Sequence, residues 1–269
     1  GTRRFQGVFT LPPHQKLLEL SGVGMDFLVE CKGMLYIVAT PIGNLKDITL
    51  RAIETLKACE FMIAENPHYS KRLLDYIDGL SLNNDSTLPQ SSPRQERRLI
   101  QFAEHNEQQV VKDLARRLAK AGGCLITDAG TPGISDPGFR LVRECIRNNI
   151  QVIPVPGPNA AITALSASGL PTDRFSFLGF LQKTASKTVE ALQSAADAEA
   201  TAIFYESPER ILKTLSYISN AFPTSQVVVA RELTKIHEEF IRGTPQAVME
   251  QLKDRPNIKG EITVVVSFK

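Results

Sequence analysis

One stretch of the sequence, residues 124–138 (CLITDAGTPGISDPG), constrains the fold more than any other. Its first four residues are largely apolar and predict a buried strand. Two glycines and a proline then turn the chain sharply, and Asp136-Pro137 has the residue types preferred at the N-cap and the first position of a helix. The stretch therefore predicts a strand, a tight loop and a helix, which is typical of an open α/β sheet.

The loop in this stretch predicts a small-molecule site. In an open α/β sheet a ligand binds beyond the carboxyl ends of the strands, where small residues let it approach the backbone. Gly130 and Gly133 provide such a loop. The alternative is that the two glycines only make a turn, while Asp128 and Asp136 only cap it.

The composition describes an ordinary globular protein. The chain has 269 residues, of which 42% are hydrophobic and 22% charged, enough for one large or two modest domains. A net charge of +2 does not indicate a nucleic-acid-binding protein, although it leaves room for a local basic patch.

The cysteines and the apolar runs predict a cytoplasmic protein. The four cysteines have neither CxxC nor metal-ligand spacing, so we expect reduced thiols and no metal site. No apolar run is long enough to span a membrane, and the first 30 residues lack the pattern of a secretory signal.

Strand and helix patterns alternate along the first half of the chain. We interpret residues 1–33 as an extension of uncertain status and residues 34–155 as an α/β domain with a mainly parallel sheet. Asp47 and Asn106 are the expected N-caps of two of its helices, and a third helix is expected from about Ser70 to Ile77. The polar residues 82–93 predict a loop.

A second α/β domain is expected over residues 156–269. Pro156-Gly157-Pro158-Asn159 breaks the alternation, and the helix that follows, 160–168, consists mostly of small residues that allow close packing. Polar clusters lie next to three later strand patterns. Residues 205–207 and 231–235 end two of these patterns, and residues 259–261 precede the last one. A cleft between the two domains, lined by such strand ends, is the expected ligand site.

A basic segment precedes the central motif. Two readings are open for it, a solvated helix face or a nucleic-acid contact. Its residues are Arg94, Arg97, Arg98, Lys112, Arg116, Arg117 and Lys120. The sequence contains no GxGxxG, Walker, HExxH or GxSxG motif, which argues against dinucleotide oxidoreductases, NTPases, zinc proteases and α/β-hydrolases.

Eight short blocks, in this order from about Met34 to the end of the chain, together resemble a family of ribosomal RNA methyltransferases within the tetrapyrrole methylase superfamily. Their order and number make the resemblance specific. They are residues 35–45 (LYIVATPIGNL), 47–52 (DITLRA), 105–108 (HNEQ), 128–132 (DAGTP), 154–158 (PVPGP), 204–207 (FYES), 231–235 (RELTK) and 259–261 (KGE).

The resemblance implies a class III methyltransferase that transfers a methyl group from S-adenosylmethionine to the ribose 2′-hydroxyl of a cytidine in the decoding region of 16S ribosomal RNA. It also implies a homodimer that acts on the small ribosomal subunit. The cofactor would lie between the two domains. The residues implied to bind it are Pro41, Asp128, Gly130, Thr131, Pro132, Ala161, Phe204, Tyr205, Glu206, Leu233 and Gly260.

Removing the hydroxyl proton calls for a base, and Glu65, Glu232 and Lys235 are the candidates. Each is also a possible partner in an ordinary salt bridge. The implied RNA contacts are His68, Arg94, Arg97, Arg98, Arg116, Arg117 and Arg231.

Two features of the sequence separate this chain from others in the superfamily. Where the resembled family usually has Glu-Asp-Thr-Arg, this chain has Glu65-Asn66-Pro67-His68. Its first loop reads Thr40-Pro41-Ile42-Gly43 and lacks the glycine-rich loop of the corrin and sirohaem enzymes. The competing readings are a tetrapyrrole methyltransferase, and a non-catalytic RNA-binding assembly factor that keeps the fold.

Overall fold

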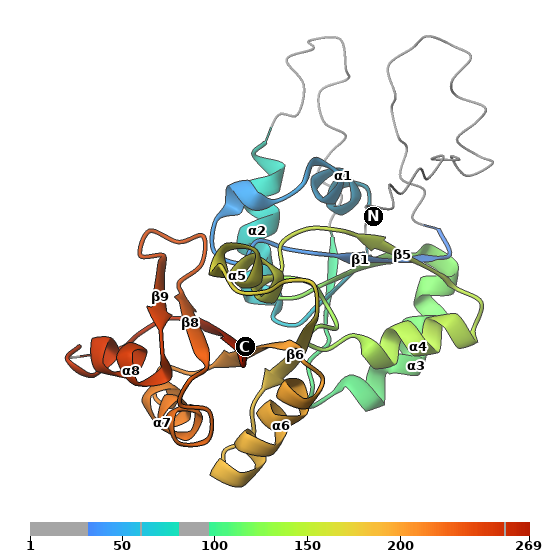
Figure 1. Cartoon of the computed structure of the whole chain (residues 1–269). Coiled ribbons are helices and arrows are strands. Elements are labelled where there is room, and N and C mark those ends of the chain that lie inside the picture. The colour runs from blue at the N-terminus through green and yellow to red at the C-terminus, as the bar shows by residue number, and fades with distance from the viewer. Residues whose placement is uncertain (1–31, 60, 81–96, 256) are drawn as a thin grey trace, which may run out of the picture.

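The computed structural model describes residues 32–59, 61–80, 97–255 and 257–269 (Figure 1). Most of the expected extension over residues 1–33, the expected loop over 82–93 and Arg94 lie outside the described residues. Two five-stranded sheets organise the chain, each with helices on both faces (Figure 1). The expected α/β class is confirmed.

The first sheet is entirely parallel, as the alternating pattern predicted. Its strand order is β3-β2-β4-β1-β5. The strands are β1 (Met34–Val38), β2 (Phe61–Ala64), β3 (Arg98–Gln101), β4 (Gly123–Ile126) and β5 (Gln151–Val155).

Helices cover both faces of this sheet, and the change of face creates a crevice. Helices α1 (Leu50–Ala58) and α2 (Pro67–Asp78) pack on one face, α3 (Glu107–Ala121) and α4 (Phe139–Arg147) on the other. After β1 the chain crosses to β2, towards the β3 side of the sheet. After β4 it crosses to β5, towards the other side. Ligands of open α/β sheets bind at such a reversal, beyond the carboxyl ends of the two strands.

The second sheet is mixed, with order β6-β7-β10-β8-β9. Only β6 and β7 are parallel, and the remaining pairs are antiparallel. The strands are β6 (Phe175–Phe180), β7 (Thr201–Glu206), β8 (Gln226–Arg231), β9 (Glu239–Gly243) and β10 (Ile262–Ser267).

Helix α5 (Ala160–Ser168) connects the two halves but packs on the second sheet. Helices α6 (Ala185–Asp197), α7 (Ile211–Ala221) and α8 (Pro245–Lys253) cover the other face. The alanines of α5 lie against strands β7, β8 and β10, and Ile42 of the first half joins the same apolar cluster. We propose that the domain boundary falls between residues 155 and 156, since α5 has its core contacts in the second half.

Several helices begin at other residues than predicted. Helix α1 is capped by Thr49, whose hydroxyl accepts from the Ala52 N–H, because Asp47 ends a short 3₁₀ turn, η1 (Leu45–Asp47). Helix α2 begins three residues earlier than expected, with Asn66 as N-cap and Pro67 at the first position. The unusual Asn66-Pro67-His68 sequence therefore works as a helix start.

The predicted cap of α3 is confirmed in position only, and the predicted cap of α4 is wrong. Asn106 is at the N-cap position of α3, as predicted, but its side chain accepts from the Ala103 N–H and makes no capping bond to the helix. Helix α4 starts after Gly138, whose φ of 154° closes the loop tightly, so Asp136-Pro137 stays within the loop. The Asp136 side chain is left half-buried beside other carboxylates instead of capping a helix.

Gly123 at the start of β4 has no room for a side chain. A Cβ atom there would lie 2.5 Å from the backbone oxygen of Phe61 and 2.7 Å from its ring. We expect Gly123→Ala to lower the free energy of unfolding by about 1–3 kcal/mol, the usual cost of overpacking, in urea denaturation. Gly79→Ala is the matched control, because Gly79 has a φ of −76° and its Cβ would have only ordinary contacts, so equal losses in both variants would contradict the argument.

Candidate functional site

The loops that follow β1 and β4 are joined by hydrogen bonds at the crevice. Thr40 and Gly130 exchange two backbone bonds, of 2.8 and 3.1 Å, and the Thr40 hydroxyl donates to the Thr127 carbonyl at 3.1 Å. Gly130 has a φ of 88°, a conformation that favours glycine. The Thr131 hydroxyl donates to the Pro158 carbonyl at 3.1 Å and so ties this loop to the start of the second half. The predicted ligand loop is therefore held rigidly.

Three carboxylates gather at this edge of the first sheet, from β2 and from both ends of the β4–α4 loop. Burial raises the pKa of Asp136 to about 7, with added repulsion from Glu65 and Asp128 and a smaller opposing effect of the Thr127 hydroxyl. Burial also raises the pKa of Glu65, and the Asp128 charge raises it further. The pKa of Asp128 is raised by burial as well. We name Glu65, Asp128 and Asp136 the carboxylate cluster.

The cluster has an open hydrogen-bonding position. Oδ1 of Asp128 is buried and has no hydrogen-bond partner within the part of the chain that the structure describes. A buried acceptor without a donor costs free energy, so it marks a place where a ligand can donate. Pro41 and Pro132 are buried in the loops that follow β1 and β4, and as prolines they provide no backbone N–H donor there.

The second half contributes an aromatic side to the crevice. Tyr205 of β7 packs edge-on against Phe177 and Phe180, with ring centroids 5.1 and 5.6 Å apart. Burial raises the pKa of Tyr205, the Ala161 backbone N–H opposes this, and the charge of Asp136 raises it further. Tyr205 is therefore close enough to Asp136, in the other half, to feel its charge.

Phe204 and Glu206 point the other way. The Phe204 ring lies in the core with α7, on the far face of the sheet. The Glu206 carboxylate is buried and accepts from the Ser207 N–H at 2.8 Å and the Thr214 hydroxyl at 2.5 Å, with Arg210 3.5 Å away. Only their backbone atoms are left to face the crevice.

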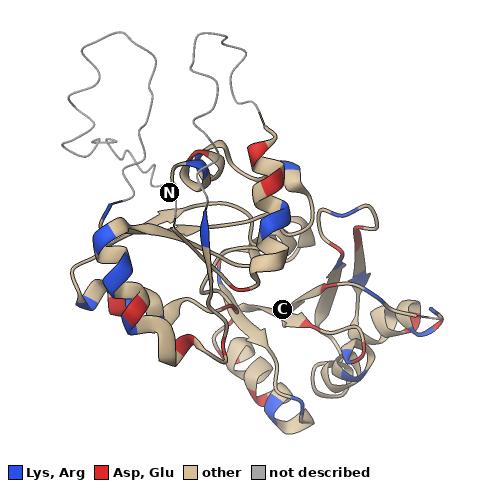
Figure 2. Cartoon of the chain, turned by 180° about the vertical axis from the view of Figure 1, so that it is seen from behind, with Lys and Arg blue, Asp and Glu red and all other residues tan. Residues whose placement is uncertain are grey.

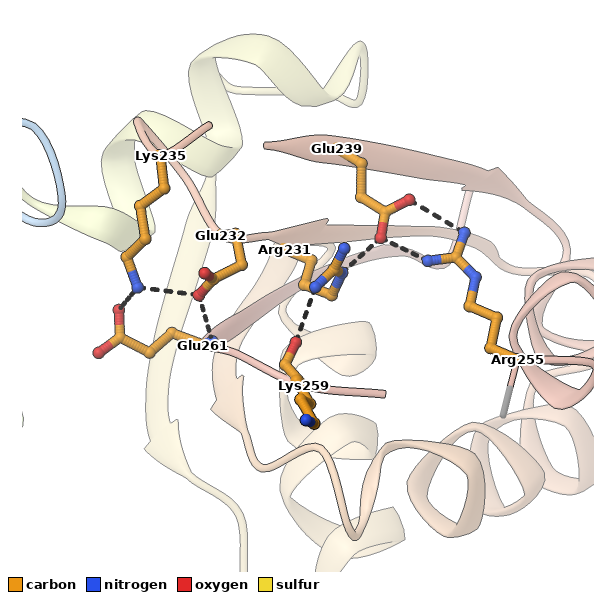
Figure 3. Close-up of polar contacts among 7 residues, drawn as sticks. All are labelled: Arg231, Glu232, Lys235, Glu239, Arg255, Lys259 and Glu261. Atoms are coloured by element: carbon orange, nitrogen blue, oxygen red, sulfur yellow. Dashed lines mark hydrogen bonds and ion pairs between the residues drawn. The ribbon is translucent and has the colours of Figure 1, made fainter. Parts of the chain in front are cut away.

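A polar network closes the other end of the crevice (Figure 3). The Lys235 ammonium lies 2.8 Å from Glu232 and 3.0 Å from Glu261, and the Glu261 N–H donates to Glu232 at 2.9 Å (Figure 3). Gly260 makes room for this arrangement, because a Cβ there would overlap the Glu232 side chain. Glu232 and Thr234 have φ values of 53° and 66°, a strained conformation for residues with side chains.

The network makes Glu232 and Lys235 poor bases. Burial acts to raise the pKa of Glu232, but hydrogen bonds from Lys235 and Glu261 outweigh it and lower that pKa. Burial acts to lower the pKa of Lys235, but its two carboxylate partners raise it. Lys235 therefore stays charged at neutral pH and Glu232 stays a weakly basic carboxylate, whereas Glu65 has the raised pKa that general bases show.

A small hollow of about 30 Å³ lies beside the network. It is lined by Ile42, Ala160, Leu233, Glu261 and Thr263, which come from both halves of the chain. Pockets for small molecules are usually about 300–1,000 Å³, so its lining must move to admit a ligand.

The predicted RNA contacts are scattered. Arg97 pairs with Asp78 through two hydrogen bonds, and Arg231 is held by Glu239, shared with Arg255, and by the Lys259 carbonyl (Figure 3). His68 is exposed in the first turn of α2, three residues after Glu65 of the carboxylate cluster. Arg98 is exposed, but it is the first residue of β3. It therefore lies at the amino ends of the strands, whereas the carboxylate cluster lies at their carboxyl ends.

Arg116 and Arg117 also lie far from the crevice. They are exposed in the second half of α3, where both pair with Asp113. The end of this helix lies beside the start of the described chain, because a Cβ on Gly33 would lie 3.7 Å from the Ala119 carbonyl. Basic segments cluster at that end of the molecule in Figure 2. These arginines therefore lie near the amino ends of the strands, on the opposite side of the domain from the carboxylate cluster.

Sequence reasoning missed Asp136 as part of the site, although its place in the same loop as Asp128 was a usable signal. Within the described residues no group of three or more His, Cys, Asp or Glu side chains has metal-binding geometry. Cys124 and Cys145 are buried free thiols, and burial raises the pKa of Cys145 to about 11. Cys59 is disulfide-bonded, so the expectation that all four cysteines are reduced is wrong. None of the described helices is long and apolar enough to cross a membrane.

Residues 34–248 match the family model described as Tetrapyrrole (Corrin/Porphyrin) Methylases. The chain belongs to this family. The match spans the first sheet and all strands of the second except β10, and it includes the carboxylate cluster and the Glu232–Lys235 pair.

Curated relatives are similar over most of the chain. A protein of Hydrogenobaculum sp. is 44% identical over 87% of this chain and 95% of its own length. Relatives from Halalkalibacterium halodurans and Escherichia coli O157:H7 are each 42% identical over 87% of this chain, and over 76% and 78% of their own lengths. All three are named "Ribosomal RNA small subunit methyltransferase I".

Solved structures share the fold. A cobalt precorrin-4 methyltransferase of cobalamin biosynthesis has a TM-score of 0.60 at 15% identity, covering 88% of this chain and 95% of its own. A diphthine synthase has a TM-score of 0.62 at 12% identity, covering 87% and 90%. At such low identity these similarities show the fold alone.

Methylases of this family take their methyl group from S-adenosylmethionine, and this chain is a methyltransferase that uses the same cofactor. The crevice fits that group on its own evidence. The cofactor carries ribose hydroxyls and an ammonium group, and the buried Oδ1 of Asp128 is an acceptor without a donor. Gly130, two residues further along the same loop, has no side chain to fill the space beside it.

Gly43 lets the two halves meet at the network. A Cβ there would lie 2.5 Å from Cγ of Lys235 and 3.0 Å from the Leu233 carbonyl. We expect Gly43→Ala to push this loop away and to weaken binding of S-adenosylhomocysteine about tenfold in isothermal titration calorimetry. Gly79→Ala should leave the affinity unchanged, and unchanged affinity in Gly43→Ala would show that the loop does not shape the cofactor site.

Proposed function

We propose that this protein methylates the ribose 2′-hydroxyl of a cytidine in the decoding region of 16S ribosomal RNA, with S-adenosylmethionine as donor. The observation that carries the proposal is the identity of 42–44%, over 87% of the chain, to relatives named as small-subunit ribosomal RNA methyltransferases. The carboxylate cluster supports the choice of a hydroxyl as acceptor, because an alcohol has to lose its proton during the transfer.

The cofactor supplies a sulfonium-bound methyl group, and the chain has to position both reactants. From the first half, Pro41, Asp128, Gly130, Thr131 and Pro132 would hold the cofactor. From the second half, the contacts would come from Ala161, Tyr205, Leu233 and Gly260 and from the backbone of Phe204 and Glu206. Holding the hydroxyl in line with the methyl group can supply several kcal/mol of the barrier.

The carboxylate cluster would take the proton. Asp136 and Glu65 have raised pKa values and are half-buried, which suits a base that works near neutral pH. Lys235 and Glu232 would instead keep the 231–235 loop in place through their ion pair. The expected catalytic roles of these two residues thus become a positioning role in this proposal.

The substrate would be the small ribosomal subunit, in the cytoplasm, and the active form a homodimer. His68 at the start of α2 would contact a phosphate near the crevice. Arg98, Arg116 and Arg117 would contact the subunit farther away, if the RNA extends around the first sheet, whereas Arg97 and Arg231 already have carboxylate partners.

The assignment is tested with tritiated S-adenosylmethionine and small ribosomal subunits that lack the modification. We expect label in the 16S RNA, in a nucleotide that resists alkaline cleavage on its 3′ side because its 2′-hydroxyl is blocked. A precorrin-type tetrapyrrole serves as the control acceptor. Label in the tetrapyrrole alone would make the chain a small-molecule methyltransferase, and thermal stabilisation by S-adenosylhomocysteine without label in either would indicate the wrong acceptor.

The pH dependence tests the base. Asp136 accepts a proton only when it is ionised, so the rate should rise with pH through about 7. Glu65→Gln removes a negative charge beside Asp136, which lowers the pKa of Asp136 and moves this rise to lower pH. Asp136→Asn should lower kcat about 100-fold or more and abolish the rise.

The opposite pattern would identify another base. An inactive Glu65→Gln variant together with an active Asp136→Asn variant would assign the proton transfer to Glu65. Binding of S-adenosylhomocysteine, measured on both variants, separates a loss of proton transfer from a loss of the cofactor.

A further inference from the structure

Phe180, at the end of β6, exposes a large aromatic ring at the crevice. Its side chain is 60% exposed, although it touches Tyr205 with an interplanar angle of 63°. Despite this contact, most of the Phe180 surface is open to solvent and available for stacking. The register of β6 against β7 shifts between Phe177 and Phe180, and such irregularities re-aim side chains next to functional sites.

The same bulge touches the loop that carries the carboxylate cluster. Gly179 has a φ of 61°, and a Cβ on it would lie 3.3 Å from the Ser135 hydroxyl. Ser135 is the neighbour of Asp136 in the chain. Phe180 therefore lies beside the proposed base, on the side of the second domain.

Phe139 is a second exposed ring, at the point where the same loop ends. It is the first residue of α4 and 65% exposed, and the Arg143 guanidinium lies 5.2 Å from its ring centroid. Phe139 follows Asp136 by three residues, which limits the separation of their Cα atoms to about 11 Å. Both rings thus lie near the loop that carries the proposed base.

Helix α4 adds positive charge at this position. It carries Arg140, Arg143 and Arg147 against the single acid Glu144, and its first turn lies at the carboxyl edge of the sheet, near the carboxylate cluster. Arg140 pairs with Glu107 and Arg147 approaches Glu144, whereas Arg143 lies over the Phe139 ring. An exposed aromatic ring with an arginine beside it suits an unpaired nucleobase and its phosphate.

We propose that Phe139, Arg143 and Phe180 form a stacking rim that holds unpaired bases of the RNA substrate on either side of the target ribose. The proposal rests on the proposed function and adds where the RNA is gripped. The rings would stack on bases and Arg143 would contact a phosphate. This would splay the strand so that one 2′-hydroxyl reaches the carboxylate cluster. The three are positioning residues and take no part in proton transfer.

The test compares Phe139→Ala and Phe180→Ala with matched controls in the full chain. Phe175→Ala removes a ring that is 43% exposed at the other end of β6, and Ile146→Ala an apolar side chain that is 62% exposed near the end of α4. We expect each rim variant to raise KM for the small ribosomal subunit about fivefold or more, while kcat and binding of S-adenosylhomocysteine stay near wild type. The two controls should keep the wild-type KM.

A conservative variant tests stacking itself. Phe180→Trp keeps a ring that can stack, so its KM should return towards the wild-type value. Unchanged KM in both alanine variants, with an active wild-type enzyme, would overturn the rim and leave the proposed function intact. A wild-type enzyme that labels no ribosomal RNA would overturn the proposed function instead. A change of sedimentation from dimer to monomer in the alanine variants would assign the rings to an interface between copies and also overturn the rim.

Discussion

The pair of backbone hydrogen bonds between Thr40 and Gly130 holds the site together. These bonds close the crevice at the point where the connections of the first sheet change direction. Through Thr131 and Pro158 the same loop is tied to the second domain. Because one short loop carries Asp128, Gly130 and Asp136, its position fixes the proposed cofactor contact, the proposed base and the approach to β6 together.

Charge is distributed differently on the two sides of the crevice. On the first domain three carboxylates crowd together, and their pKa values rise because burial and mutual repulsion disfavour the ionised forms. On the second domain Glu232 has Lys235 as a partner, and its pKa falls. The unpaired side is suited to proton transfer and the paired side to holding a strained loop, although both sides display glutamates at strand ends.

The basic residues also differ in how close they lie to the crevice. Helices α3 and α4 both carry several arginines, but α3 places Arg116 and Arg117 at the far edge of the sheet. Helix α4 begins at the near edge and adds an exposed ring beside Arg143. In the proposed function, a helix can contact RNA close to the target ribose only if its basic residues lie near the carboxyl ends of the strands. The position of these residues therefore matters more than the net charge of the helix.

The order of eight short sequence blocks indicated the cofactor family through a resemblance. The amino-acid sequence by itself also determined the parallel first sheet and the strand–loop–helix of residues 124–138. Local apolar runs, glycines and prolines specify these features without distant partners. The tertiary structure decided which carboxylates share an environment and which have a cation, and so separated Glu65 from Glu232. It also turned Phe204 and Glu206 away from the crevice and moved Asp136 from a helix cap into it. Burial, repulsion and side-chain direction depend on residues far apart in the chain, which no local pattern encodes.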